Sequence, residues 1–130
     1  MKALSLALVA LTAGCAVVTQ TDPLDREVGV RDGEQVVVDG GRLTVGVSGV
    51  PSDSRCPTDV VCVTAGEAVV VLTLAEPARA PAEVTLRTTP GKDAATYGVY
   101  RVQLLDLDPK PRSGGSPPET YLATLRIARE

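Results

Sequence analysis

The chain of 130 residues has no histidine, phenylalanine or tryptophan, and its only aromatic residues are Tyr97, Tyr100 and Tyr121. Without histidine, acid–base catalysis near neutral pH requires a carboxyl group with a perturbed pKa, and zinc or copper loses its commonest ligand. A formal net charge of −3 gives no basic excess to neutralise phosphates, and no set of aromatic rings exists on which bases would stack. We therefore expect no nucleic-acid partner, no metal and no cofactor.

Hydrophobic residues make up 44% of the chain, and many of them are valine. A chain of this length suits one compact domain with a single core. Because branching at Cβ favours the pleated surface of a sheet, a valine-rich core without large aromatic rings favours strands over helices. The composition predicts an all-β domain.

The N-terminus has the features of an export signal. Met1-Lys2 supplies a positive start, and the apolar run ALSLALVALTA at residues 3–13 is too short to span a bilayer. The sequence Leu11-Thr12-Ala13-Gly14-Cys15 resembles the lipobox of bacterial lipoproteins, in which the cysteine is acylated and becomes the first mature residue; leucine is commoner at the position of Thr12. Cleavage of an ordinary signal after Ala16 is the alternative.

On the lipoprotein hypothesis, residues 1–14 are a signal peptide that forms a helix, and residues 15–27 are a lipidated N-terminus and tether. The resemblance implies an exported protein held to a membrane by its lipid. Since Ala16 follows Cys15 in place of aspartate, the usual sorting pattern of lipoproteins implies the outer membrane, facing the periplasm, in a host with two membranes.

Cys56 and Cys62 lie between a proline-serine segment and a valine run. A metal site normally has about four ligands, and the chain offers neither histidine nor another free thiol once Cys15 is acylated. Thiol–disulfide exchange enzymes favour two intervening residues, whereas five separate this pair. In an oxidising compartment the pair therefore predicts a structural disulfide.

Alternating apolar residues separated by turn signals predict a single antiparallel β-sandwich of six or seven strands over residues 28–130. Its general architecture would be immunoglobulin-like, without the Cys…Trp…Cys pattern of true immunoglobulin domains. The expected strands are 28–30, 35–38, 42–50, 67–76, 83–88, 97–108 and 121–127. The proline-rich segment 109–119 predicts a long exposed loop, because proline supplies no backbone N–H.

The segment DSRCPTDVVCVTAG resembles a group of small bacterial exported lipoproteins without an established activity. The matching residues are Asp53, Ser54, Arg55, Cys56, Pro57, Cys62, Ala65 and Gly66. In that group a tryptophan often precedes the Ala-Gly pair, and Thr64 occupies the position here. The resemblance implies an envelope location and a common loop more than it implies a function.

Carboxylates are the remaining candidates for chemistry. Asp106 and Asp108 point the same way on a strand and, with Asp53 or Asp59, offer oxygen ligands for calcium; a solvated strand end is the simpler interpretation. Ser54 has no neighbouring base to activate it. We expect no catalysis.

The residues around the first cysteine are instead expected to shape the loop. Asp53 would accept backbone N–H groups, and Arg55 would pair with a carboxylate. Ser54, Pro57 and Gly66 complete the set of residues expected to fold this segment.

Three functional hypotheses follow. The first is a lipid-anchored module of the cell envelope with a structural or protein-interaction role. The second is an exported binder or inhibitor that acts through the proline-rich loop at residues 109–119. A hydrolase is the least supported of the three.

The lipobox hypothesis predicts that the mature chain begins at Cys15 carrying diacylglycerol. Cys15→Ala should release the protein from membranes into the soluble fraction, because no lipid can be attached without the Cys15 thiol and the apolar run before it is too short to span a bilayer. Mass spectrometry of the mature N-terminus and fractionation of the variant measure this. An unmodified N-terminus at Val17 in the wild type would contradict the hypothesis.

Overall fold

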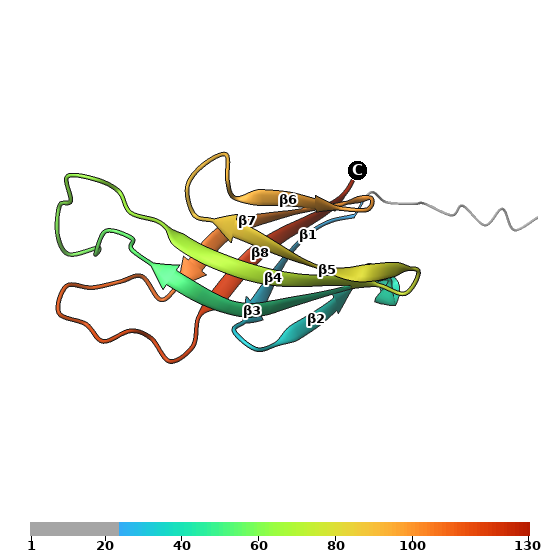
Figure 1. The fold of residues 1–130 in the computed structure, drawn as a ribbon, viewed down its shortest axis with the longest axis horizontal. Coiled ribbons are helices and arrows are strands. Elements are labelled where there is room, and N and C mark those ends of the chain that lie inside the picture. Colours follow the sequence, from blue (N-terminus) through green and yellow to red (C-terminus); the bar gives the residue numbers. More distant parts are fainter. Residues whose placement is uncertain (1–23) are drawn as a thin grey trace, which may run out of the picture.

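A computed structural model describes residues 24–130, and the signal peptide, Cys15 and the first part of the expected tether lie outside these residues. The described chain forms two four-stranded antiparallel sheets (Figure 1). The strands are β1 (Asp25–Arg31), β2 (Gln35–Val38), β3 (Leu43–Asp53), β4 (Ala68–Glu76), β5 (Arg79–Arg87), β6 (Ala94–Tyr97), β7 (Tyr100–Asp108) and β8 (Leu122–Arg129), with a short 3-10 turn η1 (Asp39–Gly41).

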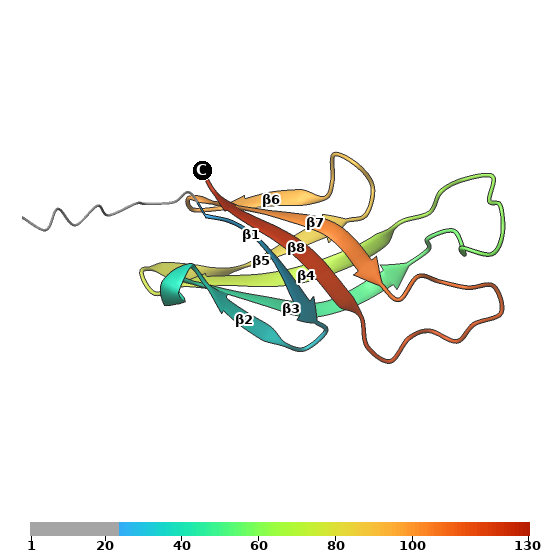
Figure 2. The ribbon, with the colours of Figure 1, turned by 180° about the vertical axis from the view of Figure 1, so that it is seen from behind.

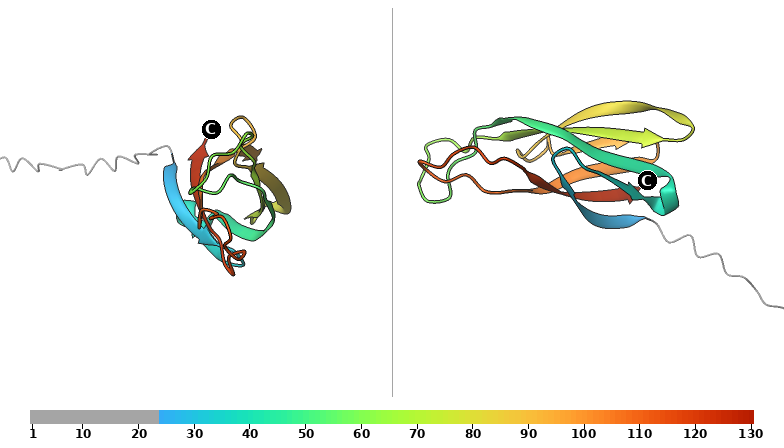
Figure 3. Two further views of the ribbon diagram at one scale, coloured as in Figure 1. Left: turned by 90° about the vertical axis from the view of Figure 1, so that its left-hand side faces the viewer. Right: turned by 90° about the horizontal axis from the view of Figure 1, so that it is seen from below.

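The two sheets differ in how the chain builds them. One has the order β2-β3-β4-β5, so each strand pairs with its neighbour in sequence. The other has the order β1-β8-β7-β6, which places the first described strand beside the last (Figure 2). An end-on view shows the sheets as two layers facing each other (Figure 3).

The core lies between the layers and consists of alternate side chains from both sheets. Along β4, Ala68, Val70, Leu72 and Leu74 are buried while the intervening residues are only partly covered. The buried set of the described residues contains eighteen hydrophobic side chains and no charged one. This alternation is the sequence pattern that predicted the sheet, and the β-sandwich architecture is confirmed.

Several strand limits differ from the sequence expectation: β3 extends to Asp53, and β5 begins at Arg79. Two further differences concern the number of strands and the start of the first strand. Eight strands form because the Tyr97–Tyr100 segment turns at Gly98, whose φ is +57°, so Ala94–Tyr97 pairs with β7 as a separate strand. The first strand begins at Asp25, inside the segment expected to be tether. The polar residues Asp25–Glu27 join the sheet because they pair with β8, where Arg126 donates to Asp25 at 2.8 and 2.6 Å.

All three tyrosine hydroxyls bridge the two sheets. Tyr97 on β6 donates to the carbonyl of Ala80 on β5 at 2.9 Å. Tyr100 on β7 donates to Asp39 after β2 at 2.6 Å, and Tyr121 before β8 donates to Asp53 on β3 at 3.0 Å. In this core the aromatic residues therefore supply polar cross-links as well as packing volume.

The long loops gather at one end of the sandwich. The cysteine loop (residues 54–67) connects β3 to β4, and the proline-rich loop (residues 109–121) connects β7 to β8. The start of β1 and the C-terminus lie at the opposite end (Figure 1). No helix among residues 24–130 is long and apolar enough to cross a membrane.

Candidate functional site

The cysteine loop is closed at its base by a close backbone approach. Ser54 N–H donates to the Glu67 carbonyl at 2.8 Å, and Glu67 N–H donates back to the Ser54 hydroxyl at 3.1 Å. A Cβ atom on Gly66 would lie 1.5 Å from the carbonyl oxygen of Ser54. Only glycine fits here, which gives Gly66 and Ser54 the loop-shaping roles expected from the sequence.

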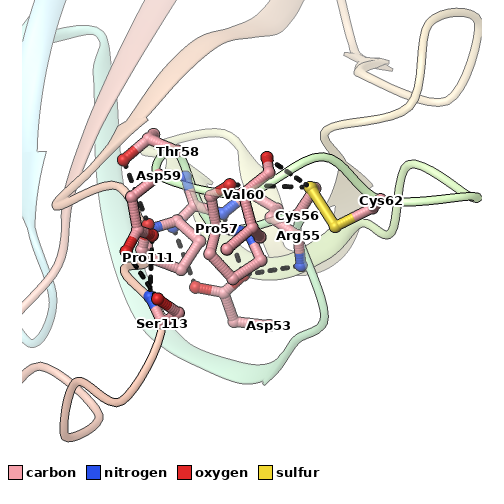
Figure 4. The surroundings of a disulfide bond; sticks show 10 residues. All are labelled: Asp53, Arg55, Cys56, Pro57, Thr58, Asp59, Val60, Cys62, Pro111 and Ser113. Atoms are coloured by element: carbon pink, nitrogen blue, oxygen red, sulfur yellow. Dashed lines mark hydrogen bonds and ion pairs between the residues drawn. A yellow bond between two sulfur atoms is a disulfide. The ribbon is translucent and has the colours of Figure 1, made fainter.

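Cys56 and Cys62 form a disulfide with an S–S distance of 2.09 Å (Figure 4). Pro57 follows the first cysteine, and its carbonyl accepts from Val60 N–H at 3.3 Å, so a tight turn lies inside the disulfide ring. The ring therefore fixes the chain between the two cysteines into a small loop at the tip of the molecule.

Arg55 joins this loop to its neighbour. Its guanidinium donates twice to Asp53, from Nε and Nη2 at 2.8 Å each. It also donates to the carbonyl of Leu107 near the end of β7 at 2.7 Å and to that of Pro109 at the start of the proline-rich loop at 2.9 Å. Both side chains of the ion pair are nearly covered, with exposures of 12% for Arg55 and 13% for Asp53. The carboxylate expected from the sequence is thus Asp53 itself, while the two carbonyl partners come from distant sequence.

A second set of contacts joins the loops further out. Thr58 N–H donates to the Pro111 carbonyl at 3.0 Å. Ser113 donates to Asp59 through its N–H at 2.9 Å and through its hydroxyl at 2.5 Å (Figure 4). The two loops are therefore joined both by the Arg55 contacts and by these outer contacts. We call the combined structure, residues 54–67 and 109–121, the two-loop end.

Each carboxylate considered as a calcium ligand accepts a hydrogen bond from another side chain. Lys110 Nζ donates to Asp106 at 2.5 Å and to Asp108 at 2.8 Å, so one ammonium group compensates both charges. Asp53 is bound by Arg55, and Asp59 by Ser113. Within residues 24–130 no group of three or more metal-ligating side chains is present. The arrangement favours the interpretation of a solvated strand end for Asp106 and Asp108.

These contacts lower the pKa values of three carboxyl groups. The hydrogen bonds from Arg55 lower the pKa of Asp53 below its ordinary value, against an opposing effect of burial. The Ser113 hydroxyl lowers the pKa of Asp59, and the Lys110 ammonium lowers the pKa of Asp106. All three groups are therefore held as carboxylates, and none has the raised pKa of a general acid.

Three valines of the cysteine loop are exposed. Val61 and Val63 are fully exposed, at 100% and 104%, and Val60 is 44% exposed. Elsewhere in the described chain only Val37, Val99 and Leu105 are large hydrophobic residues with comparable exposure, and they lie on other elements. We call Val60, Val61 and Val63 the valine tip. Thr64, at the position where the related pattern often has tryptophan, is also exposed beside it.

A groove of about 820 Å³ runs between the end of β3 and the proline-rich loop. The β3 side contributes Val50–Asp53, and the loop side contributes prolines, Lys110 and Arg112. Tyr121, which holds Asp53, lines it as well. Sequence reasoning identified Asp53 and the exposed loop but missed the groove, because Tyr121 and Lys110 give no local sign that they lie near β3.

Comparisons of the chain with protein-family models, with curated proteins and with solved structures found no match. The likeness of the DSRCP segment to exported bacterial lipoproteins accordingly remains a prediction.

The disulfide should contribute stability and not chemistry. Replacing both cysteines, Cys56→Ser with Cys62→Ser, should lower the free energy of unfolding by roughly 2 kcal/mol, because the unfolded chain regains the entropy that a short closed loop removes. Denaturant unfolding with and without reductant measures this. Reductant should destabilise the wild type by a similar amount and leave the double variant unchanged. A loss of disulfide-exchange activity with unchanged stability would contradict the structural role.

The Asp53–Arg55 pair should make stability depend on pH. Because the folded-state pKa of Asp53 is lowered, its contribution is present above the unfolded value of about 3.9 and is lost as the pH falls through the lower folded value. Asp53→Asn should cost about 1–3 kcal/mol at neutral pH by leaving a covered guanidinium without its anion. The difference between wild type and variant should shrink during acid titration below about pH 4. A difference that is constant from neutral to acid pH would contradict this role.

Proposed function

We propose that this chain is a lipid-anchored β-sandwich module of the cell envelope that binds a protein partner through its two-loop end. The valine tip is the observation that carries the proposal. A domain that buries eighteen hydrophobic side chains leaves three valines within four positions of one loop in contact with water. Exposed apolar residues gathered in this way are typical of an interaction surface.

The contacts that order the cysteine loop favour a binding role for the valine tip. The disulfide, the Arg55 contacts and the Asp59–Ser113 contacts hold the tip in one arrangement before any partner arrives. A surface already ordered in the free protein loses little conformational entropy on association, so more of the contact energy appears as affinity.

The position of the site agrees with attachment by an N-terminal lipid. Asp25 begins β1 at the end of the sandwich opposite the loops (Figure 1). A tether from Cys15 to Leu24 extends at most about 30 Å. A lipid at Cys15 would thus hold the opposite end near the membrane and direct the two-loop end away from it.

The alternative of an inhibitor that inserts the proline-rich loop alone into a cleft has less support. That loop is bound along one side to the cysteine loop through Arg55, Thr58 and Asp59. A partner would therefore meet both loops as one surface.

Capture experiments with the full chain in detergent test the proposal. Val61→Ser with Val63→Ser should reduce capture of an envelope protein at least about fivefold, because the apolar area buried in the contact is lost. The matched control is Val37→Ser with Leu105→Ser, which changes two exposed apolar residues on other elements. The tip pair should leave thermal stability unchanged, because Val61 and Val63 are fully exposed, whereas the control pair should lower it slightly, because Leu105 is only 41% exposed. Equal capture by the tip variant and the wild type would contradict the proposal.

A further inference from the structure

We infer that the groove between β3 and the proline-rich loop binds an extended peptide segment of the protein partner, laid along the free edge of β3 with an acidic side chain at Arg112. The inference rests on the proposed function, since it names the way in which the two-loop end would engage a protein. The valine tip and the groove are adjacent but separate features, so each is testable without the other.

The first observation is that β3 is longer than its neighbour. β2 pairs with β3 only from Leu43 to Gly46, whereas β3 continues to Asp53 along β4. Among the described residues, the only bridge to this side beyond β2 joins Asp32 to Val47. The stretch 48–53 therefore has a paired side and an open side, and its last four residues, Val50–Asp53, form one wall of the groove. An open strand edge is the structure to which extended peptides add.

The direction of the backbone groups supports this. Ser54 N–H points toward β4, where it donates to the Glu67 carbonyl at 2.8 Å. Because backbone groups alternate between the two sides of an extended chain, the N–H and carbonyl of Asp53 point toward the groove. Pro51 contributes a carbonyl and no N–H, as is usual on an edge strand. The edge thus offers a peptide two acceptors and one donor.

The opposite wall cannot continue the sheet. It contains Pro109, Pro111, Pro117 and Pro118, none of which has an N–H to donate. These rings offer apolar surface to the side chains of a peptide whose backbone pairs with β3. The wall is also held in place, since Arg55 binds the Pro109 carbonyl and Thr58 binds the Pro111 carbonyl.

The charges in the groove specify the ends of the peptide. Lys110 is bound to Asp106 and Asp108, and Asp53 is bound to Arg55, so these groups are already compensated. Arg112 is exposed and has no carboxylate within ion-pair distance among the described residues; the nearby Asp59 uses its oxygens for Ser113. Asp32, at the inner end beside β3, likewise has no ionic partner in this part of the chain. Arg112 therefore selects an acidic side chain at the outer end, and Asp32 a basic one at the inner end.

A displayed library of random nine-residue peptides, selected against the full chain in detergent, tests the inference. The enriched peptides should carry Asp or Glu near one end and bind the wild type at least about tenfold more tightly than Arg112→Glu. Arg26→Glu, the same charge change on exposed β1, is the matched control and should bind like the wild type. N-methylation of alternate backbone nitrogens in the best peptide should abolish binding, because the methyl groups remove the N–H donors that β3 accepts.

Filling the groove with a large side chain gives a second test of peptide binding. Ser52→Trp places a large ring in the groove, and Ser48→Trp places it at an exposed position of β3 outside the groove lining. Only the first should block the selected peptide. Failure to enrich any peptide, tight binding of the N-methylated peptide, or equal affinity for Arg112→Glu would overturn the inference. Self-association of the chain that Ser52→Trp abolishes would assign the groove to a second copy and also overturn it.

The outcomes separate this inference from the proposed function. If Val61→Ser with Val63→Ser prevents capture of the envelope protein while Ser52→Trp and Arg112→Glu do not, the two-loop end binds a protein but the groove does not hold its peptide. If neither set affects capture, the proposed function fails as well.

Discussion

The two-loop end depends on one guanidinium group. From the cysteine loop, Arg55 donates to the carboxylate of Asp53 at the end of β3 and to two carbonyls more than fifty residues away, so it connects β3 to the start of the proline-rich loop. The planar fork of arginine suits this task, because it presents several N–H donors in fixed directions. Lysine would offer a charge without that geometry. The disulfide shapes the cysteine loop, but Arg55 determines where the loop lies relative to its neighbour.

The chain has only three aromatic residues, and all three contribute hydrogen bonds that join the two sheets. Each of the three tyrosines carries its hydroxyl from one sheet to a polar atom on the other, at Ala80, Asp39 and Asp53. The valines and leucines between them fill the core but have no directional preference. The tyrosine hydroxyls add the directional contacts, and Tyr121 links this network to the loop junction through Asp53.

The fold was predictable because its signals are local. Alternation along Ala68–Glu76 and turn residues between runs need no knowledge of distant partners. The sequence also indicated that Asp53 and Arg55 shape the loop, with a carboxylate as the partner of Arg55, but it did not identify that carboxylate as Asp53. The groove was not predictable, since it requires the end of β3 to meet residues more than fifty positions later. Asp25–Glu27 were also missed as strand, because a polar edge strand has no apolar alternation and is identified only by its pairing with β8.

The pairing of the first described strand with the last has a consequence for how the chain reaches its native state. The sheet β2-β3-β4-β5 pairs only consecutive strands, so it can form from local contacts before the C-terminal strand takes its place. The other sheet cannot close until Leu122–Arg129 is in place, because within residues 24–130 it is the strand with which Asp25–Arg31 pairs. Closing so long a stretch of chain is entropically costly and slow compared with local hairpin formation. Until then β1 is an unpaired strand, and its charged residues Asp25, Arg26 and Glu27 oppose pairing with other chains during that interval.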